Sequence, residues 1–369
     1  MITTTANILV WLPFVLNVAC QPIGGTTGCA PAAPSIHAFR VDYGNYAASR
    51  AQVGPLEAQM QSAGVNLVAL GAGRAEWVFF KWAGHEANWS SDVKDTRIDF
   101  LADDTARFRQ WARVDAVVDL LAPNYIKAHR QAAAVSFTGQ PSPDWVSSTE
   151  LVSGEYGRQL LAMIEYIAAN YPVDSISLTE LCYHSQGYGP DDKAAYLAYT
   201  GRADWPRTAS GVIDRDDPSI GNWRSQLVAR FISQAAAAAH KYGKQFNLDV
   251  QVNPAKLANA AKEHGTDYNL LRQYVDRLIV WAYYDIDSYS PETLTPIARY
   301  FQAFGRDRVI VSLGLWSNQY PQTPPDALQR AMLAAQAGGI SDLWITPSLL
   351  MTPQHWQVLT DVWGARPLP

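Results

Sequence analysis

The segment YPVDSISLTELCYHSQGYGPDD, residues 171–192, carries an acid where an apolar strand pattern gives way to a polar loop. Its first half is typical of a buried strand, and Glu180 stands at the end of that strand. A carboxylic acid in this position can donate a proton to a reacting oxygen. It can also pair with Arg40, Arg74 or Arg207, which would make its role structural. We take proton donation as the hypothesis for Glu180.

Cleavage of a glycosidic bond needs one carboxylic acid to protonate the leaving oxygen, and commonly a second carboxylate as nucleophile or base. Two acids are candidates for the second role. Asp285 follows Trp281 and Tyr283 in the alternation of an expected strand, so the three side chains should share a face. Asp42 stands at the end of the first expected strand. Helix capping is the alternative role for Asp285, and a salt bridge is the alternative for Asp42.

Further polar and aromatic residues stand at or just beyond the ends of the expected strands. Their mixture of amides, rings and charges suits a neutral polyhydroxylated ligand, because amides bond hydroxyls and rings cover apolar sugar faces. Some could instead anchor loops or fill the core. The candidate ligand-binding residues are Arg40, Tyr43, Glu76, Asn124, Tyr125, Tyr183, His184, Trp205, Gln251, Asn253, Trp281, Tyr283, Asp287, Trp316 and Trp344.

The elements that must position these residues alternate from residue 36 to the C-terminus. Helical patterns separate eight strand-like runs, which together predict parallel βαβ units. Eight units favour a single-domain (β/α)8 TIM barrel with long βα loops, and no GxGxxG turn supports an open doubly wound sheet. In such a barrel, active sites gather at the C-terminal strand ends. The expected strands are 36–44, 65–73, 114–125, 174–180, 245–254, 277–287, 308–316 and 340–347.

The N-terminus reads as an export segment. Residues 1–20 contain ILVWLPFVLNVAC, an apolar run of signal-peptide length whose end resembles a bacterial lipobox and would place a lipid on Cys20. Residues 21–35 are rich in Gly, Pro, Ala and Thr and predict a flexible tether, with the catalytic barrel over 36–369. We therefore expect a periplasmic, cell-surface or membrane-anchored protein. A mis-set start codon is the alternative explanation of the first residues.

Composition narrows the class of partner. Of 369 residues, 48% are hydrophobic and 17% charged, which is ordinary for a globular protein with a large core. The net charge of −5 and the lack of a basic stripe argue against nucleic acid. The three cysteines, Cys20, Cys29 and Cys182, form no CxxC pair, and no histidine pair has metal-ligand spacing. No metal and no cofactor is expected, and the oligomeric state stays open.

Two strands carry a resemblance to known families. VDSISLTEL resembles the fourth strand of chitinase-like proteins and of the hydrolase domain of poly-N-acetylglucosamine-processing proteins. WAYYD is similar to the Met-x-Tyr-Asp strand of chitinases, with Tyr283 and Asp285 at the Tyr and Asp positions. Ser177 and Thr179 stand where chitinases carry acids, so the acid role carries over to Glu180 alone. The resemblance implies a glycoside-hydrolase-like barrel.

These observations together predict a glycoside hydrolase that cleaves a bacterial surface or environmental polysaccharide by carboxylate acid/base catalysis. Glu180 would be the general acid, and Asp285 or Asp42 its partner. Two alternatives belong to other classes: a non-catalytic carbohydrate-binding barrel lipoprotein, and another barrel hydrolase or lyase. The first would keep aromatic rings in its cleft without facing carboxylates, and the second would need an activated nucleophile or a metal.

Overall fold

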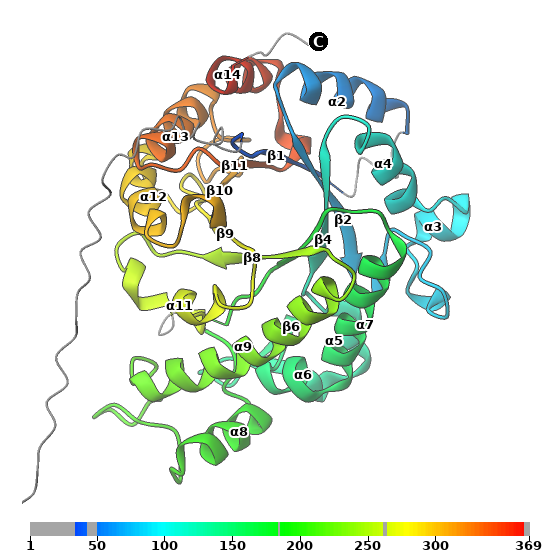
Figure 1. The fold of residues 1–369 in the computed structure, drawn as a ribbon. Coiled ribbons are helices and arrows are strands. Elements are labelled where there is room, and N and C mark those ends of the chain that lie inside the picture. The colour runs from blue at the N-terminus through cyan, green and yellow to red at the C-terminus, as the bar shows by residue number, and fades with distance from the viewer. Residues whose placement is uncertain (1–33, 43–49, 184, 261–263, 365–369) are drawn as a thin grey trace, which may run out of the picture. The chain divides into compact units, whose positions relative to one another are not determined.

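Eight parallel strands form a closed barrel in the computed structural model, which describes residues 34–42, 50–183, 185–260 and 264–364. Ser35–Pro369 form one compact unit. Each strand pairs with the next in chain order, and β1 pairs with both β2 and β11, which closes the sheet (Figure 1). The predicted (β/α)8 fold is confirmed. The barrel strands are β1 (His37–Val41), β2 (Leu67–Arg74), β4 (Arg113–Asp119), β7 (Ser175–Thr179), β8 (Gln245–Gln251), β9 (Arg277–Trp281), β10 (Val309–Gly314) and β11 (Leu343–Thr346).

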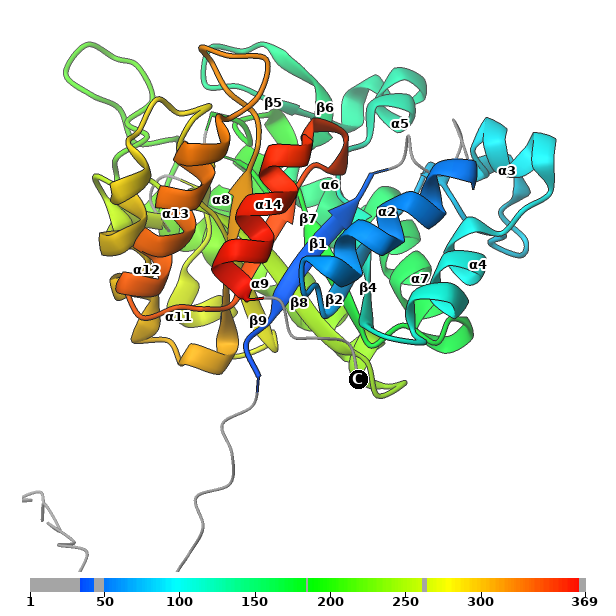
Figure 2. The ribbon, with the colours of Figure 1, turned by 90° about the horizontal axis from the view of Figure 1, so that it is seen from above.

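Helices surround the barrel, as Figures 1 and 2 show from two directions. The longer helices turn an apolar stripe inward: α7, for example, buries Leu160, Met163, Ile164 and Ile167 at helical spacing. The helices are α2 (Arg50–Ser62), α3 (Ser91–Thr96), α4 (Phe100–Phe108), α5 (Pro123–Ala128), α6 (Ser148–Ser153), α7 (Glu155–Asn170), α8 (Pro190–Thr200), α9 (Pro218–His240), α11 (Tyr268–Leu271), α12 (Leu294–Gln302), α13 (Pro325–Ala337) and α14 (Pro353–Trp363). Short 3-10 turns are η1 (Glu86–Asn88), η2 (Arg130–Ala132), η3 (Leu257–Asn259), η4 (Pro291–Thr293), η5 (Arg306–Arg308) and η6 (Ser348–Leu350).

The barrel interior is apolar in part and polar in part. A small apolar cluster fills part of the interior, and a separate large core lies between strands and helices. Because side chains alternate along a strand, residues two apart share the interior face. Buried polar residues, among them Asp115, Asp119 and Asp249, occupy other inward positions. The apolar interior cluster consists of Ile36, Ala38, Leu67, Ala69, Val117, Ile279, Ile310 and Trp344.

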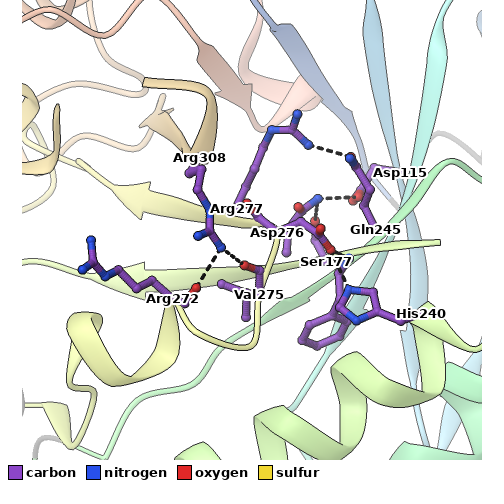
Figure 3. A network of polar contacts seen from close by, with 11 residues as sticks. Asp115, Ser177, His240, Gln245, Arg272, Val275, Asp276, Arg277 and Arg308 are labelled. Carbon is purple, nitrogen blue, oxygen red and sulfur yellow. Dashed lines mark hydrogen bonds and ion pairs between the residues drawn. The ribbon is translucent and has the colours of Figure 1, made fainter. Parts of the chain in front are cut away.

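Polar contacts tie together the N-terminal ends of the strands, opposite the expected site (Figure 3). The Arg308 guanidinium donates to the carbonyl oxygen of Arg272 at 2.7 Å, and the Arg277 guanidinium donates to Gln245 Oε1 at 2.6 Å. His240 Nε2 lies 2.7 Å from Asp276 Oδ2. This end of a TIM barrel generally serves stability rather than chemistry.

Most predicted strands are shorter than expected, β4 and β9 most of all, and one hairpin was not foreseen. β4 ends at Asp119 instead of continuing to Tyr125, because Pro123 already begins α5. β9 ends at Trp281, and residues 284–288 form a turn instead of strand. Between β4 and β7 the chain forms the antiparallel hairpin of β5 (Ala133–Val135) and β6 (Pro141–Val146). A further short strand, β3 (Trp77–Val78), pairs with the end of β2.

Candidate active site

Glu180 follows directly after β7 and has a left-handed backbone conformation with φ of 67°. Burial raises the pKa of its carboxyl to about 7, and this is the largest influence on it. The neighbouring carboxylates raise that pKa further, while the neighbouring guanidinium groups lower it. The charged groups that act on Glu180 all come from other barrel strands: Asp119, Arg40, Asp249 and Arg74.

Asp119 is the last residue of β4 and is only 6% exposed. Its carboxylate accepts a hydrogen bond from the Leu121 backbone N–H at 2.8 Å and lies 3.6 Å from Arg74 Nε. Burial raises the pKa of Asp119, although the Leu121 hydrogen bond and the Arg74 charge oppose this. Asp119 is also the neighbouring charge that raises the pKa of Glu180 most. Two electrostatically coupled acids therefore lie at the C-terminal ends of β4 and β7.

Asp249 is a third acid of the group, on β8. Trp281 Nε1 donates to its carboxylate at 2.9 Å. Burial raises the pKa of Asp249 to about 6, while bonds from Thr179 and Trp281 and the charge of Arg40 lower it. A buried carboxyl in such a setting exchanges its proton near neutral pH.

Aromatic rings continue from Asp249 along the ends of β9 and β10. The ring of Trp281 stacks on that of Tyr283 at 5.2 Å between centroids, with 20° between their planes. Trp316 in turn packs against Tyr283 at 5.2 Å. The electrostatic influence of Asp249 and Glu180 reaches the Tyr283 hydroxyl, so the row of rings borders the acid group. Planar rings beside carboxylates suit the apolar faces and the hydroxyls of sugars.

A cavity of about 520 Å³ opens beside these rings. It combines the aromatic faces with amides and a carboxylate, and Cys182 Sγ donates to Gln251 Oε1 at 3.1 Å in its wall. Cys182 is half-buried. The cavity volume lies within the usual range for sites that bind small molecules. It is lined by Cys182, Ser185, Gln251, Val252, Asn253, His264, Trp281, Tyr283, Ile286, Asp287 and Tyr289.

Asp42 and Asp285, predicted as partners of Glu180, both follow the C-terminal ends of barrel strands, β1 and β9. The Asp42 carboxylate accepts hydrogen bonds from Ser348 Oγ at 2.7 Å and from the Leu349 backbone N–H at 3.0 Å. It thereby fixes the turn after β11. Asp285 lies in the turn beyond β9, so strand alternation does not align it with Tyr283. Neither acid is among the main charges that shift the pKa of Glu180.

Glu76, Asn124 and Tyr125 come together at the start of α5. The Glu76 carboxylate accepts hydrogen bonds from the backbone N–H of Asn124 at 2.9 Å and from that of Tyr125. The Tyr125 hydroxyl donates to Glu150 Oε1 at 2.9 Å. Asn124 also lines a separate groove of about 550 Å³ between α5 and β6. These contacts give Glu76 a structural function in holding α5.

Three predicted ligand-binding aromatics are buried in packing contacts. Trp344 belongs to the apolar cluster inside the barrel. Tyr183 is fully buried, and its hydroxyl donates to the Val146 carbonyl at 3.1 Å. Trp205 stacks on Tyr196 at 4.3 Å in a satellite core. The predicted positions Tyr43 and His184 lie outside the described residues.

The sequence interpretation missed the inward-facing acids of β4. Asp115 and Asp119 stand four residues apart in VDAVVD, so they share the interior face of one strand. Asp115 accepts hydrogen bonds from Ser175 Oγ and from Asn247 Nδ2, and burial raises its pKa to about 6. The spacing of the two aspartates in VDAVVD could have identified them as acids of the barrel interior. It was overlooked because the predicted strand ran on to residue 125, which put Asp119 in its middle.

No group of three metal-ligating side chains occurs among the residues for which the structure gives a position. The candidate chemistry that the described residues offer comes from the three carboxyls, the two arginines and the aromatic row. Acids whose pKa values lie near neutrality can exchange protons with a bound substrate, and nearby arginines can stabilise the ionised partner.

Comparison with solved structures shows that the fold is shared with several glycosidases. The PgaB (BpsB) glycoside hydrolase domain from Bordetella bronchiseptica aligns with a TM-score of 0.71 and 15% identity, covering 90% of this chain and 100% of that one. The catalytic domain of β-amylase from Paenibacillus polymyxa aligns at 0.63 with 14% identity, covering 91% and 100%. A chitinase from Chromobacterium violaceum aligns at 0.54 with 10% identity, covering 90% and 100%.

By contrast, no protein-family model matches the sequence, and no curated protein matches it. At these identities the structural likeness concerns the fold. The predicted similarity to a glycoside-hydrolase-like barrel is confirmed at that level.

Proposed function

We propose that this protein is a glycoside hydrolase in which Glu180 is the general acid. The observation that carries the proposal is the position of Glu180, a partly buried carboxyl directly after a barrel strand and under the influence of a second acid, Asp119. Burial raises the pKa of this carboxyl to about 7. Such a group is protonated often enough at neutral pH to donate a proton, yet acidic enough to release it. The glycosidases that share this fold add support.

For the second carboxylate we propose Asp119. It must be ionised to attack the sugar or to activate a water. Burial raises its pKa, but the Leu121 N–H and the Arg74 charge oppose this and favour the ionised form. Asp249 is the next candidate, because it too is coupled to Glu180. Asp285 and Asp42 remain candidates from sequence, with the contacts of Asp42 to Ser348 and Leu349 favouring a structural function.

The substrate class that we propose is an oligo- or polysaccharide. Support comes from the cavity lined by Trp281, which bonds to Asp249: Trp281 and Tyr283 offer ring faces there, and Gln251 and Asn253 offer amides. Rings stack on the apolar faces of sugars, and amides bond to hydroxyls as both donors and acceptors. If the N-terminal segment directs export, the substrate is a polysaccharide of the cell surface or the surroundings.

The test is a screen of the purified full-length protein against a panel of bacterial and plant polysaccharides. Release of reducing ends is measured for the wild type and for Glu180→Gln. The proposal expects release from at least one polysaccharide by the wild type, and a large loss in the variant. Binding to a polysaccharide by affinity electrophoresis without any release would instead favour the non-catalytic carbohydrate-binding function. Equal release by both proteins would contradict the assignment of Glu180.

A further inference from the structure

Regular alternation along β7 would place the Glu180 side chain on the outer face of the barrel, away from its interior. Along β7 the inward residues are Ser175, Ser177 and Thr179, which bond to polar groups of neighbouring strands. The residues between them, Ile176 and Leu178, face the core under the helices. Strict alternation would therefore send the next side chain, that of Glu180, outward as well.

The observed backbone departs from this alternation at Glu180 itself. Its φ of 67° is left-handed, a conformation that a side chain with a Cβ atom disfavours. The Glu180 carboxyl is nevertheless electrostatically coupled to Asp119 and Asp249 of the neighbouring strands, so we infer that the turn redirects the side chain into the barrel mouth. Unfavourable backbone conformations persist where surrounding contacts hold them, and they are concentrated at functional sites.

Trp145 supplies such a contact. This residue lies on β6, and its indole Nε1 donates to the carbonyl oxygen of Glu180 at 3.0 Å. The hairpin also bonds to the segment that follows Glu180, so that Trp145 is itself held in place. These further bonds run from the Tyr183 hydroxyl to the Val146 carbonyl at 3.1 Å, from the Phe137 N–H to the Ser185 carbonyl at 3.3 Å, and from the Tyr188 N–H to the Val135 carbonyl at 2.9 Å.

We propose that Trp145 is a positioning residue: its indole holds Glu180 in the left-handed turn that directs the carboxyl into the barrel mouth. The part of this proposal that concerns turnover rests on the proposed glycosidase function. The part that concerns geometry does not, because the position of the Glu180 carboxyl can be followed by its own titration. Hairpin β5–β6 thereby becomes a support of the site, although it contributes nothing to the barrel wall.

The test compares Trp145→Phe with a matched control, Trp89→Phe, in the full-length protein. Trp89 is also partly buried and also donates its indole N–H to a backbone carbonyl, that of Trp82 at 3.1 Å, outside the candidate site. Each variant therefore loses one indole–carbonyl hydrogen bond. The Glu180 carboxyl is followed by ¹³C NMR of protein labelled in glutamate, and its signal is assigned as the one missing in Glu180→Gln.

In the wild type the Glu180 carboxyl should titrate near pH 7, because burial dominates over the charges that face it from other strands. Those charges are Asp119, Arg40, Asp249 and Arg74. In Trp145→Phe the carboxyl is released toward water, and its pKa should fall by roughly one unit or more. In Trp89→Phe it should stay at the wild-type value. On a polysaccharide that the wild type cleaves, kcat should fall about tenfold or more in Trp145→Phe with KM little changed.

An unchanged Glu180 titration in folded Trp145→Phe would overturn the proposal, whatever the protein's activity. Should Trp145→Phe fail to fold, Trp145→Tyr retains a larger ring while still removing the indole N–H, and the same criterion applies. A shifted titration in a protein without any glycosidase activity would leave the positioning proposal standing and remove the proposed function. An equal fall of the Glu180 pKa in Trp89→Phe would show that loss of any such hydrogen bond loosens the protein, and it would also overturn the proposal.

Discussion

Glu180 shows how one residue can combine a structural cost with a chemical advantage. Its carboxyl is removed from water beside two other acids, and both influences favour the protonated form. The guanidinium groups of Arg40 and Arg74 act in the opposite direction and keep the pKa near 7. The balance leaves a carboxylic acid that can both donate and regain a proton at neutral pH.

Glu180→Gln should lower turnover on an unactivated polysaccharide by ~10²–10⁴-fold, the usual contribution of general acid catalysis. The amide keeps the size and much of the hydrogen bonding of the acid but has no transferable proton. Aryl glycosides with good leaving groups need less protonation and should lose less. Steady-state kinetics on both substrate types measures the difference, and a wild-type rate on the polysaccharide would exclude Glu180 as the acid.

The same substitution should alter stability in a pH-dependent way that is independent of catalysis. Below pH 4.5 the carboxyl is protonated in both the folded and the unfolded chain, so it contributes no pH dependence. Between pH 4.5 and about 7 only the folded chain retains the proton, so wild-type stability should fall as pH rises through this window. Relative to the wild type, Glu180→Gln should therefore gain up to about 3 kcal/mol between pH 4 and pH 8. Urea unfolding of both proteins at the two pH values measures the change. The same difference in free energy of unfolding between variant and wild type at both pH values would contradict the prediction.

The partner acid can be identified by a set of amide substitutions at Asp119, Asp249, Asp285 and Asp42. A nucleophile or base is needed for every substrate, so the correct variant should lose activity on polysaccharide and aryl glycoside alike. We expect this result for Asp119→Asn, because Asp119 is the acid most strongly coupled to Glu180. Asp285→Asn is compared with it, because the expected strand alternation had favoured Asp285 as the second carboxylate. A uniform loss in Asp285→Asn with Asp119→Asn active would reverse the assignment.

At the scale of elements, the long connections after β4 and β7 build the site more than the strands do. The chain after β7 is held from one side by hairpin β5–β6 and from the other by α9. Arg224 of α9 is 1% exposed and donates to the carbonyls of Tyr183 at 3.1 Å and Gly187 at 3.3 Å. Gly187 has φ of +82°, and a Cβ there would meet the Arg224 guanidinium at 3.3 Å. A side chain at residue 187 would therefore disturb the same support.

Arg224→Met should destabilise the protein by about 3–5 kcal/mol, since it leaves two buried carbonyls and the buried acid Asp192 without the guanidinium. Methionine conserves most of the volume, so the loss reflects polar contacts. Arg230→Met, at an exposed position of the same helix, is the control and should change stability by under ~0.5 kcal/mol. Urea unfolding measures both variants, and equal stabilities would show that Arg224 does not support the loop.

At the scale of the whole molecule, the predicted export segment lies outside the residues that the structure describes. Among the residues that the structure describes, no helix is both long and apolar enough to cross a membrane. The predicted lipid site, Cys20, lies outside those residues, as do Cys29 and most of the predicted tether. Export and anchoring therefore stay predictions from sequence.

Lipidation of Cys20 predicts that the mature protein partitions into the detergent phase when expressed in a bacterium with its own N-terminus. Cys20→Ser should move it to the aqueous phase, because a single hydroxyl cannot accept the thioether-linked lipid. Cys182→Ser is the control, since Cys182 lies in the barrel domain and should leave partitioning unchanged. Detergent phase separation followed by immunoblotting measures both. Equal partitioning of wild type and Cys20→Ser would exclude the anchor.

The sequence by itself determined the barrel and the position of its leading acid. Alternation within each run and the order of runs are local properties, so all eight strands and their parallel arrangement could be predicted from residue patterns. The rule that strand ends meet at one side of a barrel then brought Glu180 into the candidate site. Strand ends were less accurate, because the turn after β9 and the start of α5 depend on neighbouring elements.

Only the tertiary structure decided which groups meet Glu180. The pairing of Arg74 with Asp119 and the bond from Trp145 to Glu180 join residues 45 and 35 positions apart, and no local pattern encodes them. Asp285 was favoured because the predicted sixth strand continued past Trp281, where β9 ends. Asp119 was missed because the predicted third strand continued past Asp119, where β4 ends. The left-handed backbone at Glu180 breaks the regular alternation of β7, since contacts distant in sequence outweigh the local preference of its backbone.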